Sequence, residues 1–168
     1  MQKVIITVTN TKKGLARLTS YPERPRGIQY EVPLYIVTVA GKDKNNIPVL
    51  KEFKAIRFGV KRTETINAHV VGLQDSQSYT LKWNWITTMD ENAWRVYDGF
   101  FVHRGPINPL GGEFGSIGCI EICGHNEWKR FNNLIIELAN CKNEKEVSDK
   151  KYAKIIYQTA IRPALKIV

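Results

Sequence analysis

Short runs of β-branched and aromatic residues recur over the first 125 residues, and Gly, Pro, Asn or Asp bound most of these runs. Apolar and polar residues alternate within residues 4–8 and again within residues 35–39. Every second side chain of a strand faces the same side, so alternation predicts strands with one buried face. Because this pattern fills most of the chain, it restricts the fold to a mainly β class.

Further strands are expected in residues 53–60 and 79–85, and on both sides of the Asp98-Gly99 pair. An Asp-Gly pair between apolar runs is a strong signal for a tight hairpin turn. The run that follows this turn ends at His103. We therefore expect His103 at the end of a hydrophobic strand. The four tryptophans of the chain fit cross-strand and core packing better than ligand stacking.

The period of the apolar residues changes after Gly124. Residues 128–138 carry apolar side chains at helical spacing, with His125 or Asn126 as a cap. A second helix is predicted for residues 148–160, with Ser148 as its cap. The predicted class is thus α+β, mainly β, with two helices near the C-terminus. A length of 168 residues fits one domain, residues 1–168.

The charge balance favours an anionic partner, since 25 basic residues against 16 acidic ones give a net charge of +9. Nucleic acid, a membrane surface and an acidic cell-wall polymer all fit this balance. The basic residues are scattered, which argues against a nucleic-acid-binding arm. No apolar run has the length of a membrane span.

Glycine is concentrated between residues 99 and 124, where seven of 26 residues are glycine. Glycine allows backbone conformations closed to other residues and leaves room for a bound ligand. The loop with Gly111, Gly112, Gly115 and Gly118 therefore predicts a substrate groove or a lid, and a purely structural loop is the alternative.

Cys119 begins an apolar run directly after this loop, and His103 ends another. Adjacent strands would place the two side chains together. A thiolate attacks an acyl carbon, and an imidazole can take the thiol proton and later protonate the leaving group. The backbone N–H groups of Gly118 and Cys119 could stabilise the oxyanion. The same residues also fit a packed cysteine and a structural histidine.

The pattern of His103 followed by Ser116, Ile117, Gly118, Cys119 and Ile120 resembles the signature of the YkuD-type L,D-transpeptidase family. This resemblance is confined to the glycine-rich segment. It implies a β-sandwich-like catalytic domain that acts on the peptide stems of peptidoglycan by transpeptidation, exchange or carboxypeptidase cleavage. It assigns Cys119 as the nucleophile, His103 as the base, and Ser116 and Gly118 as residues that shape the motif. No cofactor is expected.

Two positions differ from the usual family pattern. Ile117 stands where the family has histidine, and the resulting Ser-x-Gly-Cys pattern is similar to a branch that includes antibacterial effectors of type VI secretion. Glu121 stands where an arginine is common, and there it could orient His103 or bind a substrate ammonium group. Arg104 and Asn108, in the Gly/Pro-rich segment, are further candidate substrate contacts.

The first residues show no secretory leader pattern, so we expect synthesis in the cytoplasm and delivery to the periplasm of a target bacterium. Secretion machinery and an immunity protein would then be partners. A zinc site at Cys119, Cys123 and His125 is not favoured, because structural zinc usually has two ligand pairs. The alternatives to the proposed enzyme are a non-enzymatic basic module that binds nucleic acid or an anionic surface, and another His/Cys amide hydrolase.

Overall fold

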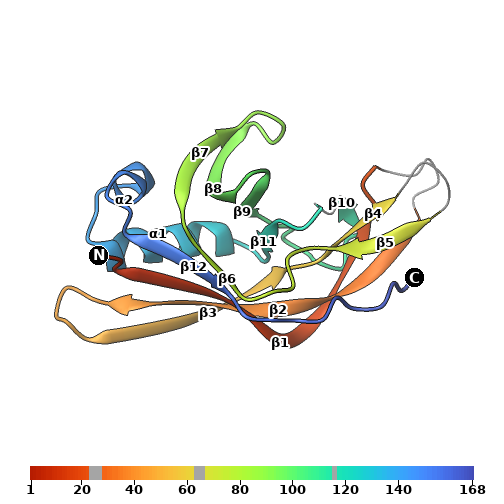
Figure 1. The fold of residues 1–168 in the computed structure, drawn as a ribbon, viewed down its shortest axis with the longest axis horizontal. Helices are drawn as coiled ribbons and strands as arrows, with labels where there is room; N and C mark the ends of the chain where they lie inside the picture. Colours follow the sequence, from red (N-terminus) through yellow and green to blue (C-terminus); the bar gives the residue numbers. More distant parts are fainter. Residues whose placement is uncertain (23–27, 63–66, 115–116) are drawn as a thin grey trace.

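The computed structural model describes residues 1–22, 28–62, 67–114 and 117–168. About half of this part of the chain is strand, and little of it is helix (Figure 1). The strands are β1 (Val4–Thr19), β2 (Gln29–Lys42), β3 (Pro48–Ile56), β4 (Gly59–Arg62), β5 (Ala68–Val71), β6 (Gln77–Thr80), β7 (Lys82–Ile86), β8 (Glu91–Tyr97), β9 (Phe100–Arg104), β10 (Glu113–Phe114), β11 (Ile120–Ile122) and β12 (Ala153–Tyr157). The helices are α1 (Glu127–Ala139) and α2 (Glu144–Asp149). The prediction of a mainly β, α+β chain with two helices near the C-terminus is confirmed.

Nine strands follow one another in a single large sheet in the order β6-β12-β1-β2-β3-β11-β9-β8-β7, and β10 pairs with β1 beside this path. Strands β6 and β7 lie at opposite edges of this sheet, although only Leu81 separates them in the sequence. The chain crosses between the edges in one residue because the sheet curls back on itself into a barrel-like form. Tyr79 of β6 accordingly stacks on Tyr97 of β8, with 5.0 Å between the ring centroids. Strands β4 and β5 form a separate two-stranded sheet.

Helix α1 lies against the curved sheet and closes one side of the core (Figure 1). Its buried apolar residues are Phe131, Ile135, Leu138 and Ala139. Phe131 meets Phe53 of β3 edge to face, with 5.2 Å between the centroids. Full burial of a large apolar side chain contributes about 1.5–3 kcal/mol, so this face fixes the helix to the sheet.

Three sequence predictions were wrong in detail. Residues 53–60 were expected as one strand, but β3 ends at Ile56, and β4, which begins at Gly59, belongs to the separate sheet. Residues 79–85 were expected as one strand, but the chain leaves β6 at Leu81, whose N–H donates to the carbonyl of Ala153, and crosses to the other edge. Residues 148–160 were expected as a helix. Instead α2 ends at Asp149, and β12 pairs in parallel with β1 and antiparallel with β6. Backbone pairing on both sides of β12 outweighs the weak helical spacing of this segment.

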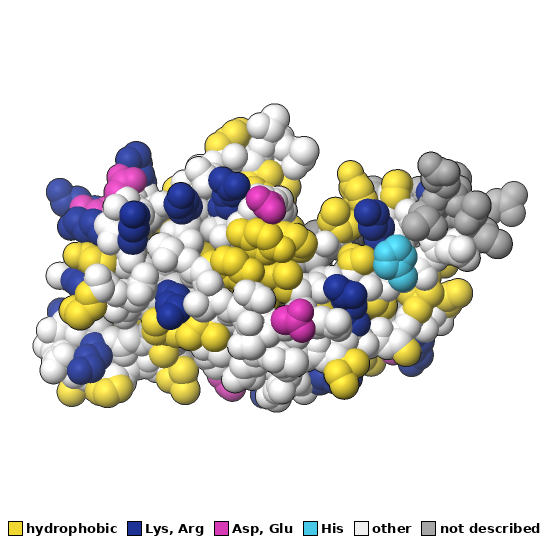
Figure 2. All heavy atoms as spheres, in the orientation of Figure 1, with side chains coloured by type: hydrophobic (Ala, Val, Ile, Leu, Met, Phe, Trp, Pro, Cys, Tyr) yellow, Lys and Arg dark blue, Asp and Glu magenta, His cyan; other side chains and the backbone are white. Residues whose placement is uncertain are grey.

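The basic side chains are dispersed among other residues on the face drawn in Figure 2. This face also carries an apolar area near its centre, below the β7–β8 hairpin. In the part of the chain that the structure describes, neither helix has the length and apolar character that a membrane span requires.

Candidate active site

A cleft of about 620 Å³ opens between the β7–β8 turn and the strands β9 and β11. In Figure 2 the outline of the molecule is indented between the β7–β8 hairpin and the lobe that carries β4 and β5. His103, Cys119 and Glu121 all line this cleft. The structure thus brings the predicted base and the predicted nucleophile to one cavity.

The pairing of β9 with β11 determines this arrangement. The two strands run parallel, with Val102 opposite Ile120 and His103 opposite Glu121. Directly paired residues project to the same face of a sheet, so the imidazole and the carboxylate share the cleft side. Cys119 lies two positions before Glu121 and also lines the cleft. Val102 and Ile120 are fully buried on the opposite face, which fixes the register.

His103 is buried, with 5% of its surface exposed. Its Nδ1 lies 2.8 Å from the carbonyl oxygen of Arg104. Since a carbonyl oxygen only accepts, Nδ1 carries the proton, and Nε2 of the neutral ring is the basic nitrogen. Burial lowers the pKa of His103 below its ordinary value, while the hydrogen bond to Arg104 and the charge of Glu91 partly oppose this effect. The imidazole is therefore neutral at neutral pH, as a general base must be.

Cys119 is 9% exposed, and its Sγ donates to the carbonyl oxygen of Gly99 over 3.7 Å. Gly118, directly before it, has a φ of +113°. A Cβ at Gly118 would lie 2.9 Å from Cα of Gly72 and 2.9 Å from a ring carbon of Phe100. Both the backbone conformation and the space at this position therefore require glycine. Gly118 sets the close packing that holds Cys119 at the edge of the cleft.

Of the three predicted substrate contacts, two line the cleft and one does not. Glu121 is 3% exposed and lies in the cleft, where a buried carboxylate needs compensating polar contacts. Arg104 lies at the exposed rim and forms an ion pair with Glu91 of β8. Asn108 is not among the described residues that line the cleft. Its Oδ1 accepts the N–H of Leu110, so it shapes a turn instead.

The glycine-rich loop was predicted to form a substrate groove or a lid, but its described glycines do not line the cleft. Its segment Glu113–Phe114 pairs with the end of β1 as strand β10. Gly111 closes a turn by donating its N–H to the carbonyl of Asn108, and among the described glycines of the loop neither Gly111 nor Gly112 lines the cleft. Ser116 and Gly115 lie outside the described residues.

Sequence reasoning missed the opposite wall of the cleft. Ile86 and Met89 reach it from the β7–β8 turn, and Tyr21 reaches it from the segment after β1. These residues give the cleft apolar walls around the thiol and the imidazole. No local motif marks them, because their positions depend on how the sheet curls.

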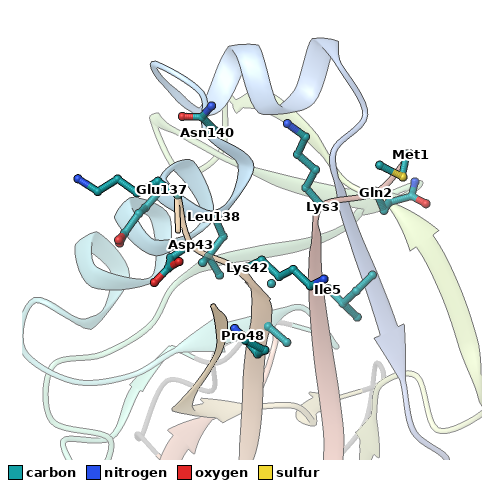
Figure 3. A pocket seen from close by; sticks show the side chains of 13 residues that line it. Met1, Gln2, Lys3, Ile5, Lys42, Asp43, Pro48, Glu137, Leu138 and Asn140 are labelled. Carbon is teal, nitrogen blue, oxygen red and sulfur yellow. The ribbon is translucent and has the colours of Figure 1, made fainter. Parts of the chain in front are cut away.

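A second cavity, of about 680 Å³, lies between the first residues of the chain and the C-terminal end of α1 (Figure 3). Lys3, just before β1, and Lys42, at the end of β2, line it, as do Glu137 and Leu138 near the end of α1. The described lining contains no cysteine or histidine, so this cavity holds no comparable nucleophile and base. Within the described ranges, no three His, Cys, Asp or Glu side chains gather as a metal site.

Comparisons with protein-family models, with curated proteins and with solved structures gave no match to this chain.

Proposed function

We propose that this chain is a cysteine acyl-transfer enzyme with Cys119 as its nucleophile and His103 as its base. The observation that carries the proposal is that both side chains line one cleft, in which the Nδ1 hydrogen bond to Arg104 leaves Nε2 of His103 as the basic nitrogen. A thiol and a neutral imidazole that share one cleft are the two groups that thiol-dependent acyl transfer requires.

The reaction has two steps. In the first, Nε2 of His103 takes the thiol proton while Sγ of Cys119 bonds to the acyl carbon. The amine leaves with a proton from the imidazolium, and a thioester remains. In the second step an amine or water attacks the thioester, gives its proton to His103, and the thiolate leaves. An amine acceptor gives transpeptidation or exchange, and water gives carboxypeptidase cleavage.

The proposed substrates are the peptide stems of peptidoglycan. The support for this class is the resemblance of His103 and the motif around Gly118 and Cys119 to the L,D-transpeptidase signature. The net charge of +9 favours binding to an anionic wall. Glu121 offers a carboxylate inside the cleft for a substrate ammonium group.

The direct test is mass spectrometry of the intact protein after incubation with tetrapeptide muropeptides. We expect an acyl adduct on Cys119 and product muropeptides, both lost in Cys119→Ala. The matched control is Cys123→Ala, which removes another buried cysteine four residues away that does not line the cleft. Turnover by Cys119→Ala, or no adduct under conditions that acylate a known L,D-transpeptidase, would contradict the proposal.

The cellular setting follows from the substrate. We propose that the protein acts in the periplasm of a target bacterium as an antibacterial effector, with a secretion machine and an immunity protein as partners. The test is expression in a bacterium with and without an added periplasmic leader. Growth should fall only with the leader, and Cys119→Ala should restore it. Equal growth with and without the leader would contradict this part of the proposal.

A further inference from the structure

Every second residue of two neighbouring chain segments lines the active-site cleft. On the segment that leads into β9 and forms it, the lining residues are Gly99, Phe101 and His103. On the segment that leads into β11 and forms it, they are Ile117, Cys119 and Glu121. Because successive side chains of a strand face opposite sides, each set of three forms a row along one face of its segment.

The two rows run in the same direction. Strands β9 and β11 are parallel, with His103 opposite Glu121. Counting back two residues on each segment brings Phe101 to the level of Cys119. The hydrogen bond from Sγ of Cys119 to the carbonyl oxygen of Gly99 shows that the segments are already adjacent before their paired residues begin. Both rows therefore change from apolar to polar in the same direction along the cleft.

Cys119 lies at the boundary between these two kinds of surface. On one side it has the aromatic ring of Phe101 and the aliphatic side chain of Ile117. Ile117 is 41% exposed and Phe101 is partly exposed, so both side chains are accessible to a ligand. The polar groups on the other side are His103, Glu121 and, at the rim, Arg104.

The position of the base determines how a substrate lies across this boundary. In acyl transfer the protonated base gives its proton to the leaving group, so the leaving atom must lie on the same side of the nucleophile as the imidazole. His103 is on the polar side of Cys119. The leaving group, and the acceptor that later takes its place, therefore bind toward His103 and Glu121. The acyl group extends the other way, over Phe101 and Ile117.

We propose that Phe101 and Ile117 select acyl donors with an aliphatic chain on the carbonyl carbon that Cys119 attacks, and that the chain therefore also hydrolyses aliphatic acyl thioesters. Apolar groups gain free energy when they leave water for such a surface. The inference rests on the proposed function, because it uses the same nucleophile and base. On a peptide donor, the same surface takes the side chain of the residue whose carbonyl is attacked.

The hydrolysis of a thioester balances with water as the only co-reactant. Sγ of Cys119 bonds to the acyl carbon while His103 takes the thiol proton, and the leaving thiolate departs with that proton. Water then attacks the acyl-enzyme and gives a proton to His103, which passes it to the sulfur of Cys119 as the thioester bond breaks. The products are a thiol and a carboxylic acid.

The test compares two series of thioesters. In the first, the ethyl thioesters of butanoic, hexanoic and octanoic acid lengthen the acyl chain. In the second, the butanoyl thioesters of ethane-, butane- and hexanethiol lengthen the leaving group. We expect kcat/KM, measured from the released acid by chromatography, to rise by about two- to fourfold for each methylene added to the acyl chain, as burial of a methylene implies. The second series should stay nearly constant.

A matched pair of variants assigns the effect to the cleft. Ile117→Glu places a charge on the proposed acyl surface and should remove the rise with acyl-chain length. Ile47→Glu is the control, because Ile47 is an isoleucine of similar exposure, 57%, between β2 and β3 and does not line the cleft. This variant should keep the rise. Circular dichroism establishes that both variants are folded.

The unmodified protein already tests the inference through the two series. A flat acyl series, a rise with the length of the leaving thiol instead, or a rise that survives in Ile117→Glu would overturn it. Failure of the proposed function gives different results. Thioester turnover that is absent, or that persists in Cys119→Ala, contradicts the proposed nucleophile and this inference together. A Cys119-dependent acyl series without muropeptide turnover supports this inference and contradicts only the peptidoglycan assignment.

Discussion

His103 and Glu121 are direct partners across the parallel strands β9 and β11, and both side chains are buried in one cleft. Cys119 enters the same cleft from the residue before β11. A register shift of one residue would move the imidazole to the opposite face of the sheet. The proposed chemistry therefore depends on strand pairing as much as on the identity of the residues.

The protonation of His103 can be tested directly. Because burial lowers its pKa, the ring should gain its proton only below the ordinary value of about 6.5. NMR of the ring nitrogens as a function of pH measures this midpoint. The same spectra should show the proton on Nδ1 in the neutral ring. A midpoint at or above 6.5, or a proton on Nε2, would contradict the assigned base.

Removal of the nearby charge should shift this titration. The negative charge of Glu91 raises the pKa of His103, so Glu91→Gln should lower it further. Glu127→Gln is the matched control, because Glu127 is also ion-paired with an arginine but lies in α1 and does not line the cleft. The NMR midpoint should fall in Glu91→Gln and stay unchanged in Glu127→Gln. A similar shift in both variants would indicate a general charge effect.

Gly118→Ala should destabilise the fold by about 2–4 kcal/mol, since it combines a left-handed backbone with a close contact to the Gly72 backbone. Gly99→Ala is the control, because a Cβ there meets no atom within 4 Å. Its effect should stay below about 1 kcal/mol. Urea unfolding gives both free energies of unfolding. If both variants lost the same free energy of unfolding, neither the backbone conformation nor the close packing at Gly118 would require glycine.

The indole of Trp94 provides a test of the packing of α1. Its Nε1 donates to Oδ1 of Asn132 over 2.7 Å, and both residues are buried. Asn132→Ala should cost about 1–3 kcal/mol, because it leaves a buried donor unsatisfied. Asn133→Ala changes the next, exposed residue and should stay within about 0.5 kcal/mol. Thermal or urea unfolding of the two variants separates the hydrogen bond from helix propensity, which both share.

Local pattern was sufficient for much of the fold. Alternation in residues 4–8 and 35–39 gave strands β1 and β2, and helical spacing after Gly124 gave α1. The Asp98-Gly99 turn correctly predicted that His103 lies near the end of a strand. These signals are local because side-chain periodicity and turn conformation depend on near neighbours in the chain.

The tertiary structure decided what periodicity could not. Residues 153–157 form a strand because β1 and β6 offer backbone partners on both sides, and no local spacing reveals distant partners. The curl of the sheet brings Ile86, Met89 and Tyr21 to the cleft of His103 and Cys119. The sequence alone pointed to the candidate nucleophile and base. Their surroundings depend on contacts between residues far apart in the chain, which form only when the core closes.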